Sequence, residues 1–189
     1  MPERSALALA RDTGPARWAG DGLVLEEGPG LGALALRLKG EAERRLAAAA
    51  LGLELAGPVG TATERAGRAA LRLGPDEWLL LCARAEEGAL AGELHRGLSG
   101  YSAAIAPIGN GTVSIQASGP RVRTFLAKGT SLDLHPRAFA PGRCAVTAFG
   151  KIRVTLWQRD LERFSLFVGR SFARSFWEWA EDVAREWAR

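Results

Sequence analysis

The chain has 189 residues, of which 47% are hydrophobic, 24% charged and 7% aromatic. These fractions are ordinary for a globular protein and exclude a disordered, collagenous or coiled-coil chain. The longest uncharged apolar run, Leu46–Leu53, is far shorter than the ~18 residues that cross a bilayer. The N-terminus is too acidic, and its apolar stretch too short, for a secretory signal. We therefore expect a cytoplasmic protein with no membrane partner.

Positive charge is concentrated in one part of the chain. The net charge is +4, but the segment Gly119–Arg174 holds eleven basic and three acidic residues, which gives +8. A basic half can indicate nucleic acid or an acidic partner surface. We favour the interpretation that it is a solvated basic face, because charge blocks form interaction tails only when they are long and unbroken. Within it we predict a contact with an acidic partner surface, near Arg121, Lys128, Arg137 and Arg170.

The first part of the chain predicts an arm followed by a lobe. Residues 1–30 show no sustained period, apart from a possible short strand at Leu23–Leu25, and end at a Gly-Pro-Gly break. Residues 31–110 predict a strand, a helix, two strands, a helix and a strand. The corresponding segments are Ala33–Leu38, Glu41–Leu51, Arg68–Leu73, Glu77–Cys82, a helix containing Leu90, Leu94 and Leu98, and Ser102–Ile108.

The remaining residues, 111–189, partly repeat this order. The sequence Gly109-Asn110-Gly111 is typical of a tight hairpin leading into a strand at Thr112–Ser118. A helix opening at Pro120, a long loop at Ser131–Gly142, three strands and a helix from Ser171 to about Trp187 follow. The three strands are Cys144–Phe149, Ile152–Trp157 and Phe164–Val168.

Strand pairs interleaved with helices favour an α+β fold with split β-α-β (ferredoxin-like) units and antiparallel strand pairs. We predict a single α+β domain over residues 31–189, made of two pseudo-repeated lobes at about 31–110 and 111–189. Residues 1–30 form the N-terminal arm in this scheme.

The last helix carries the most informative pattern. At 100° per residue its large apolar side chains fall within a stripe about 80° wide, which predicts the buried face: Phe172, Phe176, Trp179, Val183 and Trp187. Trp177 lies about 140° from Phe172 on the same helical projection and is flanked by alanines. Such a tryptophan either widens the buried face or contacts another chain. We predict that Trp177 is a partner contact.

The sequence offers no clear catalytic or cofactor motif. Gly28–Ala33 resembles a dinucleotide-binding glycine motif, but it precedes a strand instead of following one. Asp133 and His135 are two residues apart in a loop, a spacing more typical of local turn bonds than of a catalytic dyad. No cluster has metal-ligand spacing, and Cys82 and Cys144, in apolar stretches, are predicted to be reduced core thiols. We therefore predict no catalytic, cofactor-binding or metal-binding residue in this chain.

Several segments nevertheless resemble one family along nearly the whole chain. The most specific are Leu132-Asp133-Leu134-His135-Pro136 and Arg170-Ser171-Phe172-Ala173, which are similar to the gamma subunit of heterotetrameric sarcosine oxidase. Arg4–Leu7, Leu73–Leu79, Ser118–Arg121, Leu126–Gly129 and Pro141–Cys144 resemble the same family in the same order. Residues Ile105–Thr112 depart from the family pattern, which leaves room for another N-methyl amine as the substrate of the complex.

The resemblance implies a cytoplasmic four-subunit flavoenzyme. Such an enzyme oxidatively demethylates sarcosine to glycine with tetrahydrofolate and oxygen, giving methylenetetrahydrofolate and hydrogen peroxide. It implies NAD and tetrahydrofolate in the alpha subunit, FAD and FMN in beta and zinc in delta, whereas gamma has no assigned cofactor or catalytic residue. The implied fold is that of the aminomethyltransferase folate-binding domain, and the implied role is assembly and stability of the complex.

Two other classes of function stay open. A stand-alone folate-binding or aminomethyltransferase-like protein would share the fold but would need a carboxylate in its pocket. A single-strand nucleic-acid binder would use Trp157 as a stacking platform, surrounded by the arginines Arg123, Arg137, Arg153 and Arg170. The sequence lacks the repeats of such a binder, so we expect no nucleic-acid partner.

Overall fold

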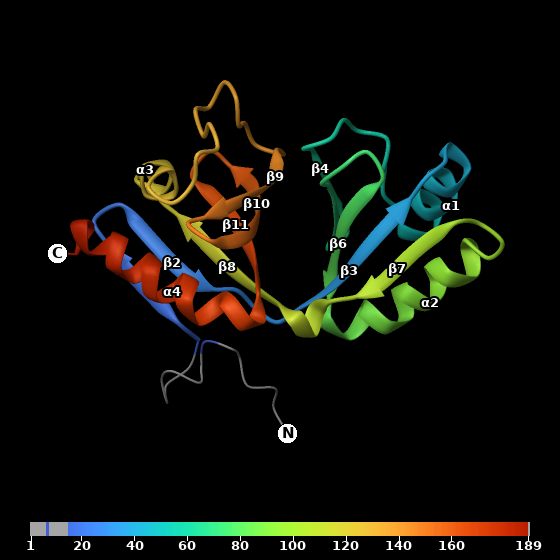
Figure 1. The fold of residues 1–189 in the computed structure, drawn as a ribbon, viewed down its shortest axis with the longest axis horizontal. Helices are drawn as coiled ribbons and strands as arrows, with labels where there is room; N and C mark the ends of the chain where they lie inside the picture. The colour runs from blue at the N-terminus through green and yellow to red at the C-terminus, as the bar shows by residue number, and fades with distance from the viewer. Residues whose placement is uncertain (1–6, 8–14, 189) are drawn as a thin grey trace. The chain divides into compact units, whose positions relative to one another are not determined.

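The structure is a computed structural model, and it describes Leu7 and residues 15–188. The chain divides into two compact units, drawn in Figure 1. One comprises residues 30–110 and is called the middle unit here. The other, called the terminal unit, comprises residues 1–29 together with residues 111–189. The chain passes from the middle unit to the terminal unit between residues 110 and 111.

The middle unit is a five-stranded antiparallel sheet with two helices. The strand order is β4-β5-β6-β3-β7, and every neighbouring pair is antiparallel. In chain order its elements are β3 (Leu31–Leu38), α1 (Glu41–Leu51), β4 (Ala62–Arg65), β5 (Arg68–Arg72), β6 (Glu77–Ala83), a 3-10 turn (Arg84–Glu86), α2 (Glu87–Gly97) and β7 (Ala103–Pro107).

The core of the middle unit follows from sequence alternation. Leu34, Leu36 and Leu38 fall on one face of β3 because alternate residues of a strand share a face, and all three are fully buried. They pack with residues of β6, α1 and α2. Helix α1 ends at Gly52, whose φ of 65° is the left-handed conformation that glycine adopts readily.

The terminal unit is a six-stranded antiparallel sheet, also with two helices. The strand order is β1-β2-β8-β11-β10-β9. Its elements are β1 (Arg17–Gly20), β2 (Leu23–Glu27), β8 (Thr112–Ser118), α3 (Val122–Ala127), β9 (Cys144–Phe149), β10 (Ile152–Asp160), β11 (Arg163–Gly169), α4 (Arg170–Ala184) and a last 3-10 turn (Arg185–Trp187).

The two units repeat one topology. In each, a central strand leads into a helix, three strands form a meander, and a second helix follows. The last meander strand pairs antiparallel with the central strand: β6 with β3, and β11 with β8. The central strand and β5 or β10 therefore run parallel with one strand between them. In the middle unit β6, α2 and β7 form a split β-α-β unit, because β6 and β7 both pair antiparallel with β3, which lies between them. The predicted α+β fold class is confirmed.

The predicted N-terminal arm is wrong, and one strand of the middle unit, β4, was not predicted. Residues 15–29 are no separate arm, because β1 and β2 are strands of the terminal unit's sheet and Leu23 and Leu25 lie in its core. Residues 1–6 and 8–14 of the predicted arm lie outside the described part of the chain. Strand β4 lies in a polar segment, Ala62–Arg65, that lacks the apolar alternation of a predicted strand.

The predicted hairpin at Gly109-Asn110-Gly111 is also wrong. These residues form a 3-10 turn, and the strands on either side belong to different sheets. None of the three has the positive φ that a type I′ hairpin turn requires. Glycine is needed at 109 for another reason: a Cβ there would lie 2.5 Å from the Glu87 carboxylate and 2.7 Å from the Leu31 carbonyl oxygen.

The buried face of α4 is rotated from the predicted stripe. Trp177 is only 5% exposed and packs in the core of its own unit, so its predicted exposure as a partner contact is wrong. Phe172, predicted to be core, is 54% exposed. Ala173, Ala180 and Ala184 are buried beside Trp177. Their small side chains let the chain's own sheet approach, where the sequence pattern suggested another chain.

Both cysteines are buried and neither forms a disulfide, as predicted. Cys82 lies in β6 and Cys144 begins β9. Burial raises the pKa of the Cys82 thiol, and the nearby Glu86 and Glu87 carboxylates raise it further. The Cys82 thiol is therefore held in its neutral, unreactive form.

The rotated face gives a test of the α4 packing. We expect Trp177→Ala to lower the free energy of unfolding by about 3–5 kcal/mol, because it leaves a large cavity in the core. Phe172→Ala is the matched control on the same helix and should change it by less than about 1 kcal/mol, because Phe172 is mostly exposed. Urea unfolding followed by far-ultraviolet circular dichroism measures both. A larger loss for Phe172→Ala would contradict the packing.

Candidate functional site

The terminal unit presents a long loop between α3 and β9, the orange segment of Figure 1. Leu134 and Phe139 anchor the loop because both side chains are buried in the core, and the Phe139 ring stacks on Phe164 with 6.3 Å between ring centroids. Between these anchors His135, Pro136, Arg137 and Ala138 are all exposed. The loop is thus an ordered projection with a polar tip.

Arg123 of α3 fixes the loop from inside. Its guanidinium donates hydrogen bonds to the carbonyl oxygens of Leu134 and Phe139, the second at 3.2 Å, and lies 5.3 Å from the centroid of the Phe164 ring. Burial lowers the pKa of Arg123 from its ordinary value. The guanidinium therefore satisfies loop carbonyls that have no partner in regular secondary structure.

Asp133 and His135 make local turn bonds. The His135 backbone N–H donates to the Asp133 carboxylate at 2.9 Å, and His135 Nδ1 accepts the Arg137 backbone N–H at 3.2 Å. These bonds shape the loop tip, and neither of them joins the Asp133 carboxylate to the His135 ring. The pair is therefore a turn motif, and the tip presents Arg137 outward as an exposed cation.

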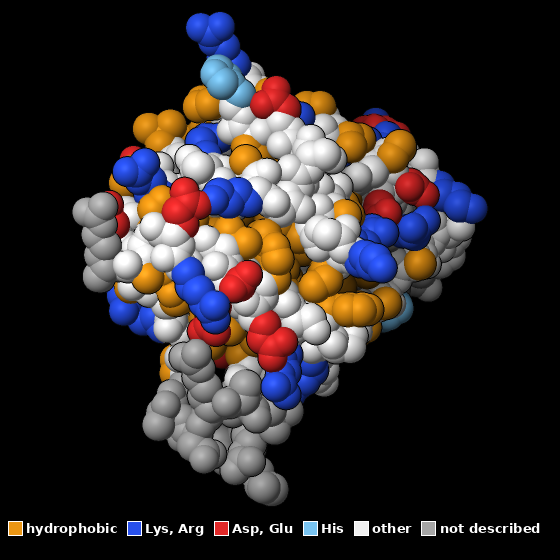
Figure 2. Space-filling model, turned by 60° about the vertical axis from the view of Figure 1, so that its left-hand side comes forward, with side chains coloured by type: hydrophobic (Ala, Val, Ile, Leu, Met, Phe, Trp, Pro, Cys, Tyr) orange, Lys and Arg blue, Asp and Glu red, His pale blue; other side chains and the backbone are white. Residues whose placement is uncertain are grey.

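The other predicted interface cations lie at separate places in the terminal unit. Arg121 is exposed at the start of α3 and Lys128 at its end, while Arg170 is the first residue of α4. Lys128 forms an ion pair with Glu186 and lies 5.0 Å from the centroid of the Trp187 ring. Figure 2 likewise shows Lys and Arg side chains interspersed with acidic ones, without a continuous basic patch on the face drawn.

Arg170 has an electrostatic neighbour in Glu27 of β2. Burial raises the pKa of the Glu27 carboxyl, whereas a hydrogen bond from the Ala16 backbone N–H, 3.2 Å long, and the charge of Arg170 act in the opposite direction. Lys128 and Arg170 thus already have acidic neighbours within their own unit. Arg121 and Arg137 are the predicted cations best placed to meet an external acidic surface.

The arrangement does not support the nucleic-acid alternative. Trp157, its expected stacking platform, is only 3% exposed, and the Arg159 guanidinium lies 3.9 Å from the centroid of its ring. Arg123 is occupied by loop carbonyls. A base could not stack on Trp157 without displacing its surroundings.

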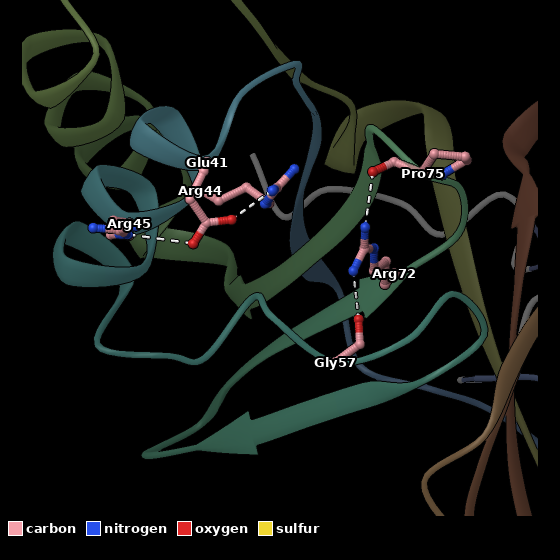
Figure 3. Close-up of polar contacts among 6 residues, drawn as sticks. All are labelled: Glu41, Arg44, Arg45, Gly57, Arg72 and Pro75. Atoms are coloured by element: carbon pink, nitrogen blue, oxygen red, sulfur yellow. Dashed lines mark hydrogen bonds and ion pairs between the residues drawn. The ribbon is translucent and has the colours of Figure 1, made fainter.

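The middle unit contains a second arginine that binds carbonyl oxygens, shown in Figure 3. Arg72 of β5 donates hydrogen bonds to the carbonyl oxygens of Gly57 at 2.6 Å and Pro75 at 2.9 Å. Its guanidinium also lies 5.1 Å from the centroid of the Trp78 ring. Arg72 therefore joins the loop after α1 to the turn between β5 and β6. Sequence reasoning identified that turn but missed the arginine beside it.

Figure 3 also shows how the start of α1 is fixed. Glu41 accepts hydrogen bonds from Arg44 at 2.6 Å and Arg45 at 3.3 Å, and these two arginines hold the pKa of its carboxyl below the usual range. Arg45 also lines an open groove of about 560 Å³ between α1 and β4, together with Glu54, Thr63 and Arg65. Because the groove is lined by charges of both signs, it does not favour ligands of either charge.

A third polar cluster, also missed by sequence reasoning, surrounds Glu87 at the start of α2. One carboxylate oxygen of Glu87 accepts the backbone N–H groups of Ala33 at 3.1 Å and Gly109 at 2.8 Å. The other accepts Arg84 at 3.2 Å, and Arg84 also bonds the Asn110 side chain. Glu87 thereby joins the start of β3 to Gly109, which follows β7, and Arg84 extends the cluster to Asn110. The cluster has a structural role, because both oxygens of the Glu87 carboxylate accept hydrogen bonds from groups of its own unit.

Two kinds of feature are absent from the described residues. Leu7 and residues 15–188 contain no group of three or more His, Cys, Asp or Glu side chains arranged to hold a metal ion. In the same residues, no helix combines the length and the apolar character needed to span a membrane.

The repeated antiparallel units define an α+β protein with a known fold. The chain is similar to the glycine cleavage system aminomethyltransferase T from Bartonella henselae, with a TM-score of 0.61 and 15% identity over 82% of this chain and 44% of that chain. This likeness concerns the fold alone.

Sequence comparison is more specific. A model of the sarcosine oxidase gamma subunit family matches residues 40–186. The chain is 35% identical over 151 residues to the sarcosine oxidase subunit gamma of an Arthrobacter species, covering 79% of this chain and 73% of the relative. It is 32% identical over 142 residues to that of Corynebacterium sp. strain U-96, covering 75% and 68%. This chain belongs to the sarcosine oxidase gamma subunit family.

A solved structure agrees with this membership. The chain is similar to a chain of the heterotetrameric sarcosine oxidase from Corynebacterium sp. U-96, determined in complex with pyrrole 2-carboxylate. The TM-score is 0.87 and the identity 30%, and the match covers 100% of this chain and 98% of that chain. The resemblance noted in the sequence is confirmed.

The role of Arg123 can be tested by proteolysis. We expect Arg123→Leu to free the loop, because the carbonyls of Leu134 and Phe139 lose their donor. Limited trypsin digestion should then cut after Arg137 about tenfold faster than in the unmodified chain, since cleavage follows local opening. Arg153→Leu, at an exposed position of β10, is the control and should leave the rate unchanged. Equal rates for both variants would contradict the anchoring role.

Proposed function

We propose that this chain is a noncatalytic subunit of a heterotetrameric sarcosine oxidase and acts in the assembly and stability of that complex. The observation that carries the proposal is the end-to-end likeness to one chain of such an oxidase, over 100% of this chain and 98% of the other. The anchored loop and the structural role of the Glu87 carboxylate support a scaffold in place of a reaction centre.

The complex would contain alpha, beta and delta subunits beside this chain. It would act as an oxidoreductase on the CH–NH bond of sarcosine, with tetrahydrofolate and oxygen as co-substrates and glycine, methylenetetrahydrofolate and hydrogen peroxide as products. We place FAD, FMN, NAD, zinc and tetrahydrofolate in the partner subunits, and the whole complex in the cytoplasm. A stand-alone folate-binding or aminomethyltransferase-like protein is disfavoured by the family match.

Co-expression tests the proposal. The partner subunits of the same organism would be produced with and without this chain, and the complexes purified through a tag on the beta subunit. We expect omission of the chain to reduce the yield and the thermal stability of the complex. The remaining complex should keep its KM for sarcosine, because this chain would not contact substrate. Unchanged yield and stability, or a changed KM at full assembly, would contradict the proposal.

The exposed cations give a second prediction. We expect the double substitution Arg121→Gln and Arg137→Gln to slow association with the partner subunits about tenfold at low salt, because opposite charges steer encounter. The effect should shrink above about 0.3 M salt through screening. The double substitution Arg174→Gln and Arg185→Gln is the control, since these arginines pair with Glu178 and Asp182 within their own helix region. A salt-independent rate, equal in both variants, would argue against an acidic partner surface.

A further inference from the structure

Strand β7 ends the five-stranded sheet of the middle unit without a charged residue. Its sequence is Ala-Ala-Ile-Ala-Pro, and the only strand paired with it among the described residues is β3. Ala104 and Ala106 are exposed, whereas Ile105 is half-buried against the core of the unit. Edge strands of this kind are usually protected by charge, and β7 has only Pro107 at its end.

The register shows which backbone groups of β7 point outward. Ile108 donates its N–H to the Ala33 carbonyl oxygen at 2.7 Å, and Ala106 and Ala104 occupy the same alternating positions opposite Ala35 and Arg37. Because bonded and non-bonded residues alternate along an antiparallel pair, the N–H and C=O groups of Ile105 point away from β3. The described part of the chain provides no hydrogen-bond partner for either group.

The terminal unit shows how an equivalent edge is completed. By topology β2 corresponds to β7, because each pairs antiparallel with the central strand of its sheet. Strand β2, however, has a further strand on its outer side, the four-residue antiparallel strand β1. Trp18 of β1 packs against the core while Arg17 is exposed. The middle unit has no described counterpart of β1.

The other sheet edges are protected in ways that β7 is not. Strand β1 carries the exposed Arg17, which forms an ion pair with Glu26 of β2, and β4 carries Glu64 and Arg65. Strand β9 is uncharged, but the Thr147 hydroxyl on it bonds that of Thr130, and Gly150 beyond it donates its N–H to the Gly129 carbonyl oxygen. Segments of the same chain thus lie against β9.

We propose that the outer edge of β7 receives a short antiparallel strand from a partner subunit, which completes the sheet of the middle unit. The inference rests on the proposed function, because the donor is a neighbouring subunit of the oxidase. The incoming segment would be about four residues long, as β1 is. It would carry an apolar side chain on the face shared with Ile105, as β1 carries Trp18. Its backbone would bond the N–H and C=O of Ile105.

A proline substitution tests the backbone contact selectively. Ile105→Pro removes the outward N–H but leaves the bonds from Ala104 and Ala106 to β3 intact. Ile105→Ala is the matched control, which removes the same side-chain packing but keeps the N–H. In titrations of the co-purified partner subunits with each full-length variant, we expect Ile105→Pro to bind about tenfold more weakly than Ile105→Ala. Equal binding of two folded variants would overturn the proposal.

Hydrogen exchange of the unmodified chain gives a readout that does not depend on a folded variant. We expect the Ile105 amide to exchange readily in the free chain and at least about tenfold more slowly in the complex. Equal exchange in both states would overturn the proposal. Protection in the free chain would also overturn it, because the edge would then be covered without any partner subunit. Failure of the unmodified chain to join the complex would instead contradict the proposed function.

Discussion

Two surface loops of this protein depend on hydrogen bonds that arginine side chains donate to loop carbonyl oxygens. Loops contain carbonyl groups that regular secondary structure cannot satisfy, and burial without a partner is costly. Arg123 meets this need for the loop after α3, and Arg72 meets it for the loop after α1. Each guanidinium also lies against an aromatic ring, Phe164 or Trp78. Each can therefore be partly buried and still keep its charge compensated.

Loops held in this way are consistent with the proposed scaffold role of the chain. A binding loop that was disordered would lose conformational entropy when a partner bound it. In the loop of residues 131–142, the tip is instead held on both sides, by the buried Leu134 and Phe139. The exposed tip, which includes Arg137, therefore has a fixed conformation. The Glu87 carboxylate stabilises the middle unit in a similar way, by collecting backbone N–H groups of Ala33 and Gly109.

Much of the fold could be predicted from the sequence because local signals and packing agree there. The strand predicted at Ala33–Leu38 from its alternation lies within the observed strand Leu31–Leu38, and the helix predicted to stop at Gly52 does end there. Strand β4 was missed because it owes its conformation to pairing with β5 and has no apolar alternation of its own. Residues 109–111 were misassigned because glycine there permits close contact with Glu87 and forms no hairpin turn.

The candidate site was less predictable than the fold, because side-chain partners far apart in sequence define it. An angular projection of α4 selects the largest apolar residues and overlooks the alanines that actually face the sheet. Trp177 was therefore placed outside the core and Phe172 inside it, the reverse of what the structure shows. The charge count likewise identified a basic segment but could not show that Lys128 is paired with Glu186. Arg72 and Glu87 gave no sequence signal beyond their type.

The central claim is that this chain supports an oxidase without taking part in its chemistry. A structure of the complete complex, purified from its own cells with flavin and folate bound, tests that claim most directly. The account predicts that partner subunits contact this chain at its surface and that no atom of a flavin, nicotinamide, folate or zinc lies within hydrogen-bonding or coordination distance of it. A cofactor or substrate held by side chains of this chain would contradict the account.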